Sequence, residues 1–160
     1  MRSKFGLAIA AVPLFLFNTS SVAFAAPAKV CDLMTGETAA AVLGRPVKAG
    51  REEVIGAGTA QCVFETPNGS QSVYAGWMDP KALMGVTAAA ALKVAQMDKS
   101  QTSESISGIG EAALFSASAM ESKVTVLYRE RLILVGTVSS KNPGVKAALI
   151  QAAKQIMGKM

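Results

Sequence analysis

The residues in this chain best suited to chemistry are two cysteines, Cys31 and Cys62. No histidine is present, which excludes Ser-His and Cys-His catalytic pairs and histidine-ligated zinc or haem. In an oxidising compartment, an even number of cysteines predicts a disulfide, here Cys31–Cys62. A reactive or metal-binding pair stays the alternative, although two sulfurs alone make an incomplete zinc site.

Three carboxylates are the remaining candidates for acid–base work. Glu52 and Glu53 are adjacent, so on a strand they point to opposite faces. We interpret both as solvated charges on an edge strand. Asp79 precedes Pro80, which is typical of a helix cap. The sequence therefore predicts no catalytic residue, and a carboxylate-based hydrolase is the least favoured hypothesis.

Motifs for cofactors and metals are missing or weak. The segment "GIGEAA" (Gly108–Ala113) matches a dinucleotide-binding pattern, but a polar loop precedes it and a strand-like segment follows it. A true site needs a strand before it and a helix after it. The segment is better interpreted as a tight turn into a strand. The methionines lack the close spacing of a thioether metal site, so we predict neither cofactor nor metal.

The N-terminus has the pattern of a secretory signal. Arg2 and Lys4 precede an apolar run from Phe5 to Phe17, and Ala23-Phe24-Ala25 is a small-x-small cleavage site. The run is shorter than the roughly 20 residues that span a bilayer. We predict a signal peptide over residues 1–25 and a single exported domain over residues 26–160, periplasmic or extracellular, with no membrane span in the mature chain.

Periodicity along the mature chain predicts an α+β fold. The expected helices cover residues 32–44, 79–97 and 142–160, with the last carrying an apolar stripe over Val145, Ala148, Leu149, Ala152 and Ile156. Residues 45–55 are expected to be an extended edge, residues 56–60 a flexible connector, and residues 98–104 a loop. Hairpins are predicted over residues 61–78, around Asn68-Gly69, and over residues 123–139. The order αβββαβββα, with two similar halves, predicts an antiparallel sheet with helices packed on one face.

Several residues are candidates for ligand or partner contact. Trp77 and Tyr74 lie on opposite faces of one predicted strand, and an aromatic side chain on an uncovered face can serve as a binding handle. Pro67, Asn68 and Gly69 form the tip of the predicted hairpin. The formal charge of +5 falls to +3 if Arg2 and Lys4 leave with the signal. Basic residues are scattered, so nucleic acid is not an expected partner.

Four segments together resemble a known class of proteins. They are "CDLMTGETAAAVLGRPV", "GIGEAALFS", "LILVGTVS" and the C-terminal amphipathic helix. The series is similar to small exported bacterial proteins of unknown function, including actinobacterial secreted and lipoprotein families that are LpqN-like, with the Mog1/PsbP-type fold. The resemblance implies the disulfide and the α/β layering and brings no catalytic residues. The chain lacks a lipobox, so membrane anchoring is not implied.

The favoured hypothesis is an exported, non-enzymatic binding protein. Its ligand would be an envelope component, a protein partner or a small apolar ligand, bound through the exposed sheet face. The alternative is an inhibitor of a secreted or host enzyme, which would use the "ETPNGSQ" loop. Neither the ligand nor the oligomeric state follows from the sequence.

Overall fold

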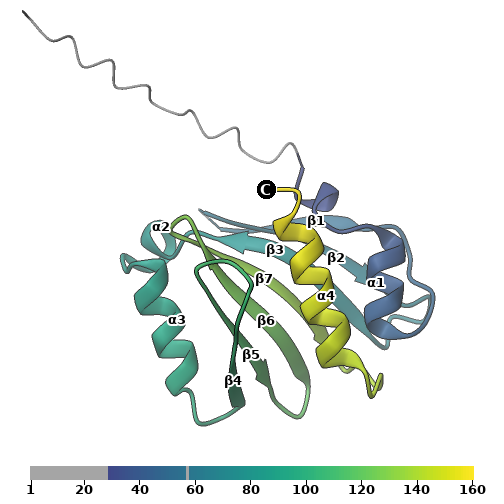
Figure 1. Cartoon of the computed structure of the whole chain (residues 1–160). Coiled ribbons are helices and arrows are strands. Elements are labelled where there is room, and N and C mark those ends of the chain that lie inside the picture. Colours follow the sequence, from purple (N-terminus) through teal and green to yellow (C-terminus); the bar gives the residue numbers. More distant parts are fainter. Residues whose placement is uncertain (1–28, 57) are drawn as a thin grey trace, which may run out of the picture.

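The computed structural model describes residues 29–56 and 58–160, so the predicted signal peptide and its cleavage site lie outside the described residues. The described chain forms one seven-stranded sheet flanked by helices (Figure 1). The strands are β1 (Arg51–Gly56), β2 (Thr59–Glu65), β3 (Ser72–Met78), β4 (Thr102–Ile106), β5 (Ala112–Ala117), β6 (Glu121–Tyr128) and β7 (Arg131–Val138). The helices are a 3₁₀ turn η1 (Val30–Asp32), then α1 (Gly36–Leu43), α2 (Pro80–Met84), α3 (Ala88–Met97) and α4 (Val145–Met157).

The sheet is antiparallel throughout, in the order β1-β2-β3-β7-β6-β5-β4. Both predicted hairpins are confirmed: β2 pairs with β3, and β6 pairs with β7. They meet where β3 pairs with β7 at the centre of the sheet. The α+β class is therefore confirmed, whereas the stated order αβββαβββα is not, because the second half has four strands and the middle helix is divided.

One face of the sheet carries the main core. The register aligns Ala75 of β3 with Val135 of β7 and Val124 of β6, and all three are buried. The helices α1 and α4 cover this face, contacting each other as well as the central strands. Leu149 and Ile156 of the predicted α4 stripe are fully buried there. The helix predicted over residues 32–44 ends as predicted, with Gly44 closing it at φ 69°. It begins later than predicted, at Gly36, where the Thr35 side chain accepts from the Thr38 N–H.

The helix predicted over residues 79–97 is two helices. Asp79 caps α2 as expected, accepting from the Lys81 and Ala82 amides. Gly85 then adopts φ 68° and ends α2, because glycine takes the left-handed conformation without a Cβ penalty. Thr87 is extended, and its hydroxyl accepts from the Ala90 N–H to begin α3. The apolar periodicity continues across Gly85, so it did not indicate that α2 ends there and that α3 begins after Thr87.

Two segments that were predicted to be irregular each contain strand residues. Residues 98–104 were expected to be irregular, but Thr102–Ile106 pairs with β5 as edge strand β4. Four of its five residues are polar, which weakens the strand signal in the sequence. Residues 56–60 were expected to be a flexible connector, yet Gly56 pairs with Thr59 in a tight hairpin. The predicted edge over residues 45–55 does contain an edge strand, β1.

The helices do not all pack on one face, which corrects the predicted architecture. In β4, Glu104 binds Lys146 of α4, whereas the next residue, Ser105, accepts a hydrogen bond from Gln96 of α3. Successive residues of a strand face opposite sides. Helix α3 therefore lies across the sheet from α4, over β5, β6 and β7, and Figure 1 shows this half of the sheet between the two helices.

The predicted disulfide is confirmed. Cys31 follows the first residue of η1, and Cys62 lies in the middle of β2, so the bond ties the start of the described chain to the sheet. Gly50 packs against this bond: a Cβ added there would lie 2.6 Å from the Cys62 Sγ and 2.7 Å from the Phe64 ring. The described part of the chain contains no free cysteine.

None of the helices in the described residues is long and apolar enough to cross a membrane.

The disulfide predicts a measurable loss of stability when it is removed. Cys31→Ser with Cys62→Ser should lower the free energy of unfolding by about 2–4 kcal/mol, because the unfolded chain regains the freedom of the closed loop. Denaturant titration of the variant measures the effect, with reduced wild-type protein as the control. Equal stability of the oxidised wild type and the variant would contradict a stabilising role.

Candidate ligand-binding pocket

Trp77, one of the predicted contact residues, faces the side of the sheet that α1 and α4 cover. It is half-buried against the main core. The Arg131 guanidinium carbon lies 5.0 Å from the centre of its ring, within the range of a cation–π contact. Trp77 is therefore largely committed to packing within the protein.

Tyr74 lies on the opposite face, where it is held by a short polar chain. Its hydroxyl donates to the Glu121 carboxylate at 2.5 Å, and Glu121 also pairs with Lys123 at 3.2 Å. Its ring covers Gly136, where an added Cβ would lie 2.4 Å from the ring carbon that bears the hydroxyl. Burial, reinforced by the hydrogen bond and the charge of Glu121, raises the pKa of Tyr74 far above its ordinary value. The phenol is therefore a protonated structural group.

The predicted hairpin tip is an exposed and well-bonded turn. Pro67, Asn68 and Gly69 are all exposed. The Asn68 side-chain oxygen accepts from the Thr66 hydroxyl at 2.9 Å, the Ser70 hydroxyl at 2.8 Å and the Ser70 N–H at 3.2 Å. Turn formation accounts for Asn68 and Gly69.

The three candidate carboxylates occupy separate environments. Glu52 lies near the Cys31 N–H, and Glu53 contacts Gln61 and Arg51 on the other face of β1. Asp79 caps α2. The structure therefore brings none of the three into hydrogen-bonding contact with another. Among the described residues, no group of three or more potential metal ligands gathers at one place.

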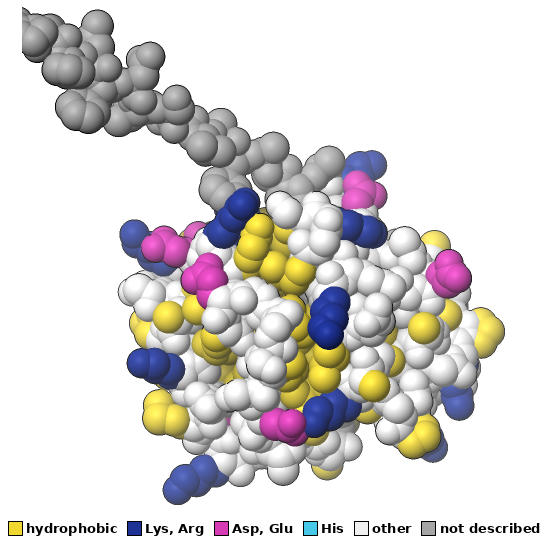
Figure 2. Space-filling model, viewed as in Figure 1, with side chains coloured by type: hydrophobic (Ala, Val, Ile, Leu, Met, Phe, Trp, Pro, Cys, Tyr) yellow, Lys and Arg dark blue, Asp and Glu magenta, His cyan; other side chains and the backbone are white. Residues whose placement is uncertain are grey.

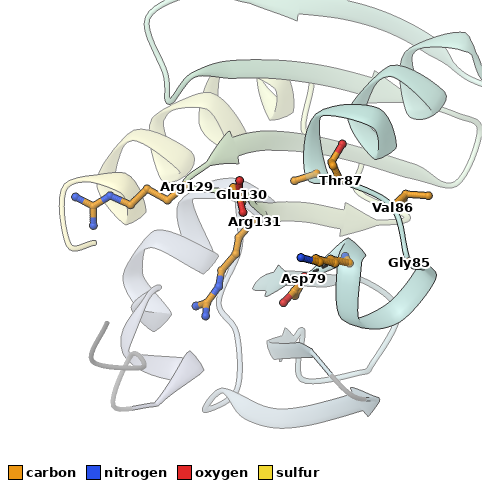
Figure 3. Close-up of a pocket in the computed structure, with 9 residues that line it drawn as sticks. Asp79, Gly85, Val86, Thr87, Arg129, Glu130 and Arg131 are labelled. Carbon is orange, nitrogen blue, oxygen red and sulfur yellow. Dashed lines mark hydrogen bonds between the residues drawn. The ribbon is translucent and has the colours of Figure 1, made fainter. Parts of the chain in front are cut away.

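A pocket of about 310 Å³ lies where α2, the start of α3 and the β6–β7 turn meet. Such a volume is at the lower end of the range for small-molecule sites. The residues that line it are Asp79, Lys81, Gly85, Val86, Thr87, Ala88, Arg129, Glu130 and Arg131. Figure 3 shows Asp79 and Thr87 on the helical side and Glu130 on the side of the turn.

The helical wall exists because the segment after β3 is broken at Gly85. The Asp79 N–H donates to the Gly58 carbonyl at 2.7 Å, which fixes the start of α2 against the β1–β2 hairpin. The caps at Asp79 and Thr87 then set where α2 and α3 begin. A single continuous helix, as predicted from the sequence, would not form this corner.

The other wall is a strained two-residue turn. Arg129 and Glu130 link β6 to β7 with φ values of 47° and 62°. This conformation normally selects Asn-Gly, because left-handed backbone costs a residue with a Cβ about 1–2 kcal/mol. The Glu111 carboxylate supports the turn by accepting from the Arg129 N–H at 2.7 Å.

The charged side chains of the turn have different surroundings. The guanidinium carbon of Arg129 lies 4.9 Å from the centre of the Tyr128 ring, and the guanidinium of Arg131 lies over the Trp77 ring. In Figure 3 both arginines extend away from Asp79. Glu130 has no hydrogen-bond or ion-pair partner among the described residues. Its carboxylate is thus available at the pocket, with Lys81 and Asp79 on the opposite wall.

Sequence reasoning did not identify this pocket. The predicted hairpin over residues 123–139 and the predicted cap at Asp79 supply its two walls, but these segments are far apart in the chain. The available signal was the pair Arg129-Glu130, because two-residue hairpin turns normally contain glycine and this one contains two charged residues instead. Recognising it required knowing that β6 and β7 pair up to Tyr128 and Arg131.

Comparison with known proteins leaves the chain without a match: no family model, curated protein or solved structure corresponds to it. The resemblance to exported bacterial families therefore stays a prediction.

The Tyr74–Glu121 contact predicts a distinct dependence of stability on pH. The unfolded chain loses the tyrosine proton near pH 10, whereas the folded chain keeps it. The free energy of unfolding should therefore fall as the pH rises above about 10, where the folded state binds the extra proton. Tyr74→Phe should cost about 1–3 kcal/mol at pH 8, and its disadvantage should shrink by about pH 11. A constant difference in denaturant titrations across this range would contradict the assignment.

Proposed function

We propose that this chain is an exported, non-enzymatic binding protein that holds a small polar ligand in the pocket beside the β6–β7 turn. The observation that carries the proposal is the conformation of Glu130, whose backbone adopts φ 62° on the pocket wall. Its carboxylate has no partner among the described residues. Strained residues of this kind concentrate at functional sites. A glycine would make the same turn at lower cost, which supports a role for the side chain itself.

The lining of the pocket favours a polar ligand over a purely apolar one. Glu130 and Asp79 supply carboxylates, Lys81 supplies a cation, and Val86 and Ala88 supply a smaller apolar contribution. A ligand with a cationic or hydrogen-bond-donating group facing Glu130 satisfies this arrangement. Lys81 would then face an acceptor on the same ligand.

Binding without chemistry is favoured by the way the groups at hand are used. The pocket presents no serine, cysteine or histidine, and the Thr87 hydroxyl accepts from the Ala90 N–H as the cap of α3, whereas nucleophilic catalysis needs a nucleophile within reach of a base. The disulfide supports an oxidising compartment and therefore export. These arguments are consistent with the signal peptide predicted over residues 1–25.

Glu130 offers a direct test by substitution. Glu130→Gly should raise the free energy of unfolding by about 1 kcal/mol, because the left-handed strain is relieved. Glu130→Gln keeps the strain and the size of the side chain but removes the charge. Both variants should lose a small molecule that the wild-type protein retains in native mass spectrometry after purification from its own exported fraction.

The two readouts separate strain from binding. Loss of the bound mass in both variants, with a gain in stability only in Glu130→Gly, is the expected result. A wild-type protein without bound small molecule, or equal retention by all three proteins, would contradict the proposal.

An inhibitor of a secreted or host enzyme stays the second hypothesis. The observation that favours it is the exposed Pro67–Ser70 turn, which the Asn68 side chain holds rigid. Replacing Pro67–Ser70 with alanines should abolish inhibition of a target enzyme while the fold persists. Unchanged inhibition would exclude this turn as the inhibitory element.

A further inference from the structure

Exposed apolar side chains concentrate on one segment of the molecule. The described residues include seven large hydrophobic side chains that are exposed, and four of them lie within α2, α3 and their linker. These four are Met84 (53% exposed), Val86 (39%), Val94 (65%) and Met97 (69%). Scattered exposed hydrophobic residues need no explanation, but a concentration of them indicates an interaction surface.

Helix α3 is apolar on the side that faces away from the sheet. Ala88 is buried and Leu92 is half-buried, so the inner side is fixed by these positions. At 3.6 residues per turn, Ala90, Val94 and Met97 share the opposite side. We call these three residues the outer stripe. A helix that is apolar on both sides is normally covered on both.

Basic side chains flank the outer stripe. Lys93 lies on the exposed part of α3, and Lys81 and Lys99 lie in the segments before and after it. Hydrophobic and basic side chains alternate along the margin of the molecule where α3 lies (Figure 2). The nearby acidic residues are Asp79, Asp98 and, across the pocket from Lys81, Glu130. The carboxylates of Asp79 and Asp98 accept local hydrogen bonds from the backbone.

We propose that the outer stripe of α3 docks on an anionic lipid surface. An interfacial helix inserts apolar side chains to the level of the acyl boundary and places lysines at the headgroups. Val94 and Met97 are suited to insertion among the acyl chains. Lys81, Lys93 and Lys99 are suited to contact with the headgroups, since the flexible lysine side chain can place its ammonium group in the charged layer.

The size of the surface argues against a second copy as the occupant. A stable dimer buries about 800 Å² on each partner. The outer stripe is one helix wide and contains two large side chains, so a symmetric contact through it falls far short of that area. A lipid surface needs no complementary shape and can accept a narrow convex stripe. Lys81 also lines the pocket, whereas Lys93, Val94, Met97 and Lys99 do not, so substitutions in the outer stripe test the docking surface without changing the pocket.

The test measures partitioning onto vesicles by co-sedimentation. The probes are vesicles of phosphatidylcholine alone and of phosphatidylcholine mixed with phosphatidylglycerol, with the wild-type protein purified from its exported fraction. Val94→Asp with Met97→Asp should weaken binding to the mixed vesicles at least tenfold. Val54→Asp with Ile55→Asp is the matched control, because these β1 side chains are 81% and 61% exposed and lie away from α3.

The expected result is wild-type binding to mixed vesicles only, loss in the α3 variant and retention in the β1 variant, with both variants melting like the wild type. Equal binding by the two variants would overturn the proposal. Wild-type binding that does not depend on phosphatidylglycerol, or no binding at all, would also overturn it. A dimer in size-exclusion chromatography that the α3 variant abolishes would assign the surface to a second copy instead.

Discussion

The register of the sheet is the constraint on which the rest of the structure depends. Alternation in each strand places one set of branched side chains on one face, and pairing β3 with β7 joins two hairpins into a continuous apolar surface. A shift of one residue would turn this set toward the other side. Helices α1 and α4 cover that face, and the disulfide holds the start of the described chain against β2.

The opposite face is built differently, and this difference bears on function. Helix α3 has one buried residue, Ala88, and the other side chains on its inner side, including Leu92, are only half-buried. Few large apolar contacts imply a lower local stability than that of the α4 side. The pocket and the outer stripe both involve this less tightly packed corner, whereas Tyr74 and Trp77 are committed to contacts within the protein. The proposed binding site therefore lies outside the main core, at a corner with fewer buried side chains.

Much of the architecture was predictable because it depends on local signals. Asn68-Gly69 predicted one hairpin, and the end of α1 was predicted at Gly44. The two sides of the sheet were not predictable in the same way. Helix α3 and helix α4 both carry apolar residues at helical spacing, and tertiary contacts such as those of Ser105 and Glu104 are needed to place them on opposite faces. The pocket was missed for the same reason, since its walls come from segments about 50 residues apart that only tertiary pairing unites.

The proposed ligand site lies between the β6–β7 turn and the α2–α3 corner. The most direct measurement is a two-dimensional amide NMR titration of the labelled protein with the small-molecule extract of its own exported fraction. We expect saturable shifts concentrated at residues 79–88 and 129–131, with the α4 side unchanged. Shifts confined to Pro67–Ser70 or to the neighbours of Tyr74, or no saturable shift, would contradict the account.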